Sequence, residues 1–335
     1  MKEFFVCPAT LASGHTTYSP GALKRLFGGH KVSPFLDFSF EESANRQTII
    51  QNMGHISISG LQEKFSGTIE KNHIRLTKEK VQGTHILKPA PWDYTISTRK
   101  QMPINEHLTM QIASQVYGIQ TAVNGLCFTS DEQPVYITRR FDISPDGNKL
   151  AQEDFAVLTG RNELSDERTF KYKGSYANIA EKIKQYIPTW QIAMEQFFRL
   201  VLFNYLYGNG DAHLKNFSLQ KKGEDYLLTP AYGLLNTAIH GDNNIFGLEE
   251  ELSQDLTKSK IYTRTGHPCK QDFANFGQLI GLKSKRVDGI LHSFTVIPKK
   301  VFLLIENSFF NSRMKSNYRC VIEERHYRFL QKPDS

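Results

Sequence analysis

The sequence predicts an α+β fold of two lobes: a strand-rich lobe over residues 1–142 and a helical lobe over residues 143–335. Two patterns indicate this division. Before Asp142, short apolar runs alternate with polar residues, as in strands that bury one face. Beyond Asp142, apolar residues recur at the spacing of amphipathic helices. With 335 residues, the chain is long enough to give each lobe its own core.

The composition is that of an ordinary globular protein: 39% of the residues are hydrophobic and only 22% are charged, which argues against disorder. The net charge of +7 and the pI near 9.0 favour an acidic partner such as a nucleotide or nucleic acid. Four cysteines without a CxxC pair indicate neither a disulfide framework nor a four-ligand zinc site. Because the sequence shows neither a secretory signal nor a membrane-spanning apolar run, we expect a cytoplasmic protein without membrane contact.

The first lobe is expected to begin with a short helix over residues 23–27, which glycine closes. Further along, a hairpin is expected over residues 55–76, in which Ser57 and Ser59 alternate with isoleucines before Gly60 breaks the strand. Backbone N–H groups and hydroxyls at such a tip can hold phosphate, which would place both serines near a transferable phosphoryl group. An ordinary hairpin explains the same pattern at least as well.

Two charged residues of this lobe are candidates for a nucleotide site. Lys88 ends an apolar strand over residues 84–87, as does the lysine with which protein kinases hold the α- and β-phosphates. The alternative is an edge-strand lysine stopped by Pro89. Glu106 lies in the first turn of a helix that opens at residue 103, where negative charge is favoured. It is equally placed to turn inward and pair with Lys88, as the corresponding glutamate of kinases does.

A strand over residues 135–138 leads into the junction of the lobes. An adenine-binding hinge is expected there, using the backbone of about Thr138, Arg139 and Phe141. Beyond the junction we expect two helices and then a pair of strands. These four elements cover residues 176–186, 190–206, 217–220 and 225–230.

The loop after the second of these helices carries the clearest chemical motif. Gly208 and Gly210 stop the helix and allow a tight turn. The loop presents Asp211 and, five residues later, Asn216. This is the arrangement of a protein-kinase catalytic loop, in which the aspartate accepts the proton of the substrate hydroxyl and the asparagine holds Mg²⁺. Lys215 is placed to offset phosphate charge. The alternative is a polar loop in which Asp211 caps the element that follows.

Seven stretches of the chain, in this order, resemble those of the HipA-type serine/threonine kinases of bacterial toxin–antitoxin systems. They are residues 57–64, 84–89, 105–106, 140–142, 152–154, 209–218 and 228–232. The resemblance extends over roughly residues 45 to 320. HipA itself has a longer segment ahead of the serine loop, and the shorter one here is similar to HipT, the toxin of three-gene HipBST systems. In that branch HipS is a separate small protein in place of the missing subdomain, and HipB is a DNA-binding partner.

The resemblance implies a two-lobed kinase fold that uses ATP and Mg²⁺ and transfers the γ-phosphoryl group to an aminoacyl-tRNA synthetase, which blocks translation. In the HipT branch the tryptophan enzyme is the target. Partners would be antitoxins of HipS and HipB type, with DNA reached only through the HipB-type protein. By motif, Lys88 would hold ATP phosphates, Asp211 would be the catalytic base and Asn216 a metal ligand. The residues implied in nucleotide contact are Ser57, Ser59, Gly60, Lys88, Glu106, Thr138, Arg139, Phe141, His213, Lys215 and Asn216.

Two features modify this expectation. Ser57 matches the family's autophosphorylated serine, and its pairing with Ser59, as a second such site, is a mark of the HipT branch. Gly233 stands where the family has a metal-binding aspartate, so Asn216 is the one motif-matched ligand left for an ion that usually takes one or two carboxylates. We therefore interpret the chain as an inactivated form of the kinase. The alternatives are a pseudokinase that serves as a scaffold for antitoxin or nucleic acid, a metal site completed by Asp242, and a small-molecule kinase of similar fold.

Overall fold

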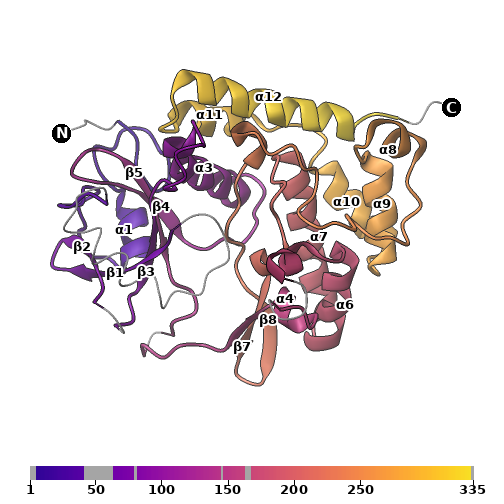
Figure 1. The fold of residues 1–335 in the computed structure, drawn as a ribbon, viewed down its shortest axis with the longest axis horizontal. Coiled ribbons are helices and arrows are strands. Elements are labelled where there is room, and N and C mark those ends of the chain that lie inside the picture. Colours follow the sequence, from indigo (N-terminus) through magenta and orange to yellow (C-terminus); the bar gives the residue numbers. More distant parts are fainter. Residues whose placement is uncertain (1–4, 41–62, 79–80, 145, 163–166, 333–335) are drawn as a thin grey trace.

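The computed structural model describes residues 5–40, 63–78, 81–144, 146–162 and 167–332, and Figure 1 shows two lobes side by side. The first lobe is built on an antiparallel sheet with the strand order β2-β1-β3-β5-β4. Its strands are β1 (Phe65–Glu70), β2 (His73–Leu76), β3 (His85–Lys88), β4 (Asn124–Phe128) and β5 (Pro134–Arg139). The strand that ends in Lys88 therefore lies inside the sheet and not at its edge.

Successive side chains of a strand point to opposite faces of the sheet. On β5 each of these faces packs against its own apolar cluster. Ile137 belongs to the apolar cluster that includes α1 (Pro20–Phe27). Its neighbour Tyr136 belongs to the cluster that includes α3 (Met102–Gln115). The prediction of a short first helix closed by glycine is confirmed, since Gly28 caps α1 after Phe27, although the helix begins at Pro20, three residues earlier than predicted. A short 3-10 turn, Arg99–Gln101, leads into α3.

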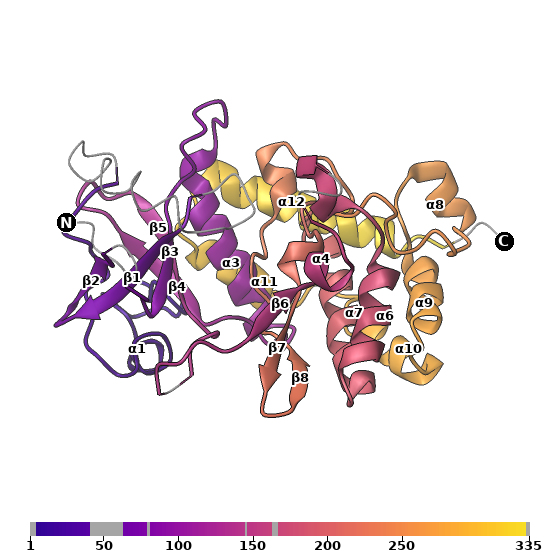
Figure 2. The same ribbon diagram turned by 60° about the horizontal axis from the view of Figure 1, so that its bottom comes forward.

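The second lobe is a group of helices around α7 (Trp190–Leu206), as Figure 2 shows from a second side. Residues 201–206 of α7 are buried on all sides, whereas Gln191, Ile192 and Gln196 in its first half are exposed. It packs against α6 (Tyr176–Tyr186), and both helices have the bounds that the sequence predicted. Further helices are α4 (Phe155–Leu158), α8 (Lys260–Thr265), α9 (Lys270–Leu279) and α10 (Ser284–His292), with 3-10 turns at Glu167–Tyr172, Leu214–Asn216 and Thr237–His240. Within the described ranges, no helix is both long enough and apolar enough to cross a membrane.

A small antiparallel sheet lies beside the loop that follows α7. Its strands are β6 (Gln152–Asp154), β7 (Ser218–Lys222) and β8 (Asp225–Leu228), in that order. The predicted pair of strands is confirmed as β7 and β8. The sequence did not predict β6, which pairs with the other side of β7 and comes from a segment more than sixty positions earlier.

The last two helices return to the first lobe. α11 (Lys299–Asn307) packs against α3, and α12 (Ser312–Phe329) runs along both lobes in Figure 1. The hydroxyl oxygens of Tyr318 in α12 and Thr109 in α3 share a hydrogen bond of 2.9 Å. The lobe boundary at residue 142 stays a prediction, because the two lobes share these C-terminal helices.

A buried polar network also joins α3 to the segment after residue 233. Asn105 makes two hydrogen bonds with the backbone of Asn236: its Nδ2 donates to the carbonyl at 2.8 Å and its Oδ1 accepts from the N–H at 3.1 Å. His240 contacts Asn105 Nδ2 at 2.8 Å and Thr98 Oγ1 at 2.7 Å. Burial lowers the pKa of His240 to about 4, so the ring is neutral near pH 7. These bonds fix α3 relative to the second lobe.

Candidate active site

The loop after α7 is held in shape by buried polar groups. The N–H of Gly210 donates to Thr237 Oγ1 at 2.9 Å, and the N–H of Asp211 donates to Asn209 Oδ1 at 3.3 Å. A Cβ atom on Gly210 would lie 2.5 Å from the carbonyl oxygen of Asn244. Only glycine allows the two backbones to approach this closely. The glycine at position 210 therefore fixes the path of the loop, and with it the direction of the Asp211 side chain.

Asp211 presents a half-exposed carboxylate in a polar surrounding. Its side chain is 47% exposed, and the hydroxyl of Tyr172 donates to its Oδ1 at 3.0 Å. His213 Nε2 lies 3.9 Å from its Oδ2. Burial raises the pKa of Asp211, the charge of Asp242 adds to this rise, and Lys171 and the Tyr172 hydrogen bond oppose it. An accessible carboxylate with a raised pKa is suited to accept a proton.

His213 and Asn216 occupy the other end of the loop. His213 is buried, and burial together with the charge of Lys171 lowers its pKa to about 3, so its ring is neutral. Its Nδ1 atom has no hydrogen-bond partner among the described residues. The N–H of His213 donates to Asn216 Oδ1 at 3.1 Å, which orients the amide. That oxygen keeps a second lone pair for another partner.

Lys88 and Glu106 form an ion pair between the sheet and α3. Lys88 Nζ lies 2.5 Å from Glu106 Oε1, and the side chains are 13% and 3% exposed. The ring of Tyr136 lies below the ammonium, 5.1 Å from its centroid. Of the two alternatives for Glu106, the structure has the inward pair. The edge-strand alternative for Lys88 is wrong, because β3 has neighbours on both sides.

Three further lysines lie close enough to Lys88, or to one another, to interact electrostatically. The pKa of Lys64 is lowered to about 7, mainly by burial and then by the charges of Lys88, Lys171 and Lys215. Burial also lowers the pKa of Lys171. Lys215 Nζ lies 5.4 Å from the centroid of the Phe170 ring. Together Lys64, Lys88, Lys171 and Lys215 form what we call the lysine cluster. Such a concentration of ammonium groups suits a polyphosphate.

One lysine of this cluster and one neighbouring tyrosine carry no signal in the sequence. Lys171 and Tyr172 end the 3-10 turn Glu167–Tyr172, which has neither a periodic pattern nor a motif. Lys64 could have been found, because it closes the serine-containing motif. The predicted residues Ser57, Ser59 and Gly60 lie outside the described residues.

Part of the expected hinge is already hydrogen-bonded to other segments of the protein. The hydroxyl of Thr138 and the N–H of Arg139 both donate to the carbonyl of Val123, at 3.0 and 2.9 Å. The carbonyl of Phe141 accepts from Gln220 Nε2 at 3.1 Å. Adenine contacts from this segment stay a prediction.

Gly233 lies directly beside Asn216. Its backbone has a φ of +67°, and a Cβ atom built on it would lie 3.0 Å from Asn216 Nδ2. A side chain at this position would thus contact the side chain of Asn216. Two ligands of one metal ion lie next to each other in the same way. Glycine supplies no donor, however, and the remaining amide is a poor site for an ion that prefers carboxylates. Asp242 lies beside the loop, with its Oδ2 3.0 Å from a Cβ atom built on Gly210. The described residues nevertheless gather no three carboxylate, imidazole or thiol side chains that could hold a metal ion, so the residues present do not fit Mg²⁺.

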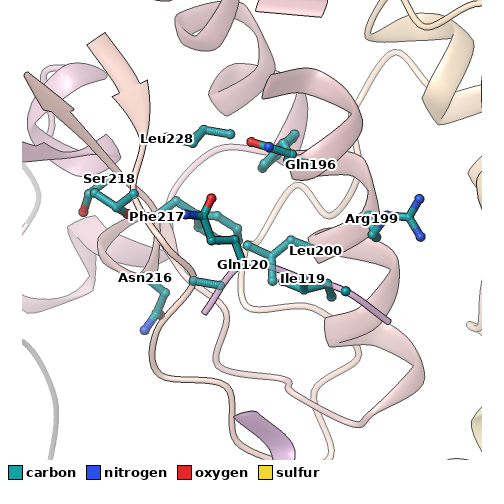
Figure 3. Close-up of a pocket in the computed structure, with 13 residues that line it drawn as sticks. Ile119, Gln120, Gln196, Arg199, Leu200, Asn216, Phe217, Ser218 and Leu228 are labelled. Carbon is teal, nitrogen blue, oxygen red and sulfur yellow. The ribbon is translucent and has the colours of Figure 1, made fainter. Parts of the chain in front are cut away.

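A pocket of about 110 Å³ lies on another side of the same loop. It is lined by α7, by β7 and β8, and by residues 118–120. Asn216 lies at its margin, but Figure 3 shows its side chain pointing away from Gln120 and Leu200, which line the pocket. The pocket is therefore separate from the site around Asp211.

The sequence matches the profile of the HipA-like C-terminal domain over residues 56–301. The chain belongs to this family. A protein of Haemophilus influenzae described as a candidate kinase is 29% identical over 282 residues, which are 79% of this chain and 78% of that protein. The candidate kinase Y4dM of Sinorhizobium fredii is 32% identical over 213 residues, 58% of this chain and 48% of that protein.

The HipA-like assignment also agrees with a solved structure. HipA of Shewanella oneidensis, in a toxin–antitoxin complex with HipB and its operator DNA, superimposes with a TM-score of 0.61 at 18% identity. The match covers 82% of this chain and 65% of the HipA chain, so this chain spans less than two thirds of that protein. The predicted two-lobed, HipA-like fold is thereby confirmed.

Proposed function

We propose that this chain is the kinase component of a toxin–antitoxin system, with ATP bound between the lobes. The observation that carries the proposal is the buried Lys88–Glu106 pair, whose ammonium belongs to the same lysine cluster as Lys215 of the Asp211–Asn216 loop. Membership of the HipA-like family and the kinase descriptions of its relatives support it. An idle polar loop would need none of these charges.

In this proposal each residue has a separate task. Lys88, held by Glu106, contacts the ATP phosphates. Asp211 orients the hydroxyl of a serine or threonine substrate and accepts its proton, while Tyr172 keeps the carboxylate in place. Mg²⁺ would supply charge neutralisation of the phosphates in a complete site. Because Gly233 offers it no ligand, we infer that phosphoryl transfer by this chain is slow.

The substrate and partners follow from the resemblance to HipT. We propose an aminoacyl-tRNA synthetase, the tryptophan enzyme first, as the protein that receives the phosphoryl group. Antitoxins of HipS and HipB type would be the partners, and DNA would be reached through the HipB-type protein. The complex of the Shewanella HipA with HipB and DNA supports the HipB-type partner and the link to DNA.

We also propose that Ser57 and Ser59 are autophosphorylation sites in a fully active form. Each phosphate would bring about −1.5 to −2 charges next to a loop that has to accept the phosphates of ATP. Phosphorylation would therefore oppose nucleotide binding. Alanine at both serines should leave ATP affinity high in the active form, whereas aspartate at both should lower it; equal affinities would refute this brake.

The test of the function is phosphoryl transfer from labelled ATP to tryptophanyl-tRNA synthetase. Gly233→Asp should transfer, and the same variant with Asp211→Asn should lose transfer by about 10²–10⁴ while still binding nucleotide. One specific observation, the glycine at position 233, favours the scaffold alternative. If Gly233→Asp is folded and binds its antitoxins but transfers nothing, the scaffold function is correct.

A further inference from the structure

The position that lacks a metal ligand lies directly beside Asn216. Gly233 holds a left-handed φ of +67°, which among residues with side chains Asn and Asp adopt most readily. A Cβ atom built on it would lie 3.0 Å from Asn216 Nδ2. The negative charge that would hold a cation is therefore missing while the surrounding backbone remains in place.

The site holds several lysines, and three of their ammonium groups are fixed in direction. Lys88 is anchored by Glu106 at 2.5 Å. Lys171 Nζ lies 4.7 Å from the centroid of the Tyr172 ring, and Lys215 Nζ lies 5.4 Å from that of Phe170. Cations over ring faces are held by the electrons of the ring without losing their charge. The ammonium groups of Lys171 and Lys215 therefore keep N–H donors for a ligand brought between them.

The carboxylates of Glu106, Asp211 and Asp242 offset part of the charge of the four lysines. The remaining positive charge repels a divalent cation and attracts an anion. In a partly buried site, the low local dielectric constant strengthens the interaction between charges a few ångströms apart. Mg²⁺ bound to ATP reduces the negative charge that the lysines can meet. The metal-free triphosphate keeps that charge, and compact ammonium groups can take the place of the ion as point charges on its oxygens.

We propose that this chain binds ATP without Mg²⁺, using the lysine cluster in place of the metal ion. The proposal rests on the proposed nucleotide site, and it specifies the ionic form of the ligand. A chain that holds metal-free ATP keeps the nucleotide in a form that is not transferred. It would respond to nucleotide concentration as a binding protein does, while still presenting the kinase surface to its partners.

The test is calorimetric titration of the whole chain with ATP in EDTA and with ATP in excess MgCl₂. We expect affinity in EDTA to equal or exceed that in Mg²⁺. Lys171→Met should lower affinity in EDTA about ten- to hundredfold, whereas Lys285→Met, an exposed lysine of α10, should leave it unchanged. In Gly233→Asp, which regains a carboxylate, Mg²⁺ should raise affinity at least about tenfold.

The outcomes separate this inference from the proposed function. If ATP binds only when Mg²⁺ is present, metal-free binding is refuted and the nucleotide site stands. If ATP binds in neither buffer to a chain that unfolds cooperatively on heating, both the nucleotide site and the inference are refuted. Adenosine serves as the probe without phosphate. Binding of adenosine as tightly as ATP would refute the role of the lysine cluster.

Discussion

Replacing Lys88 by methionine tests the ion pair on which the site depends. Glu106 is only 3% exposed, so this change leaves a buried carboxylate without its partner, which typically costs about 3–5 kcal/mol. At about 2.1 cal/mol/K per residue, the 335-residue chain has an unfolding entropy of about 0.7 kcal/mol/K. The expected decrease in Tm is therefore about 4–7 °C. Lys64 also interacts with Glu106, which favours the lower end of this range.

Thermal unfolding followed by circular dichroism measures this decrease. The double variant Lys88→Met/Glu106→Gln removes both charges, so it should recover most of the lost stability. Lys285→Met is the matched control, because its lysine is exposed on α10. The pairing would be refuted as a source of stability if Lys88→Met unfolds within about 1 °C of the parent, or if the double variant is no more stable than the single one.

Three other changes give distinct results. Asp211→Asn should raise Tm at pH 7, because the raised pKa makes the ionised carboxylate less favourable in the folded state. This gain in Tm should shrink as the pH falls toward about 4, where the aspartate is protonated anyway. A gain in Tm that stays constant with pH would contradict this. ATP affinity should fall as the pH rises through about 7, where Lys64 loses its proton; Lys64→Met should show a smaller fall with the same nucleotide, and an equal fall would exclude Lys64. Gly210→Ala should lower the free energy of unfolding by about 1–3 kcal/mol through its clash with the Asn244 carbonyl, whereas Gly289→Ala, in open space on α10, should raise it by up to about 1 kcal/mol; denaturant titration that finds equal effects would contradict the clash.

Local signals predicted the local elements well. The helices α6 and α7 have the predicted bounds because apolar periodicity and polar flanks define them within a few residues. The pairing of β7 with β8 followed from the short turn between them. The order of Lys88, Glu106 and Asp211 along the chain predicted one site, but the sequence left Glu106 with two equal orientations. Its burial against Lys88 depends on tertiary packing, which the local sequence does not show.

Distant contacts could not be predicted in this way. β6 is three residues long and pairs with a strand far along the chain, so no periodicity is available to find it. Tyr172 reaches Asp211 from an irregular segment, across thirty-nine positions. The bond between Thr109 and Tyr318 spans more than two hundred positions. Such contacts depend on how whole elements pack, which a pattern within one window does not contain.

The return of α11 and α12 to α3 has a consequence for synthesis of the protein. Domains usually fold from the N-terminus while the ribosome is still translating. Here α3, which carries Glu106, receives part of its packing only from the last two helices. The nascent chain therefore cannot complete the proposed nucleotide site before α11 and α12 have been synthesised. A product truncated before these helices would lack this support, and proteases can remove such an incompletely folded chain.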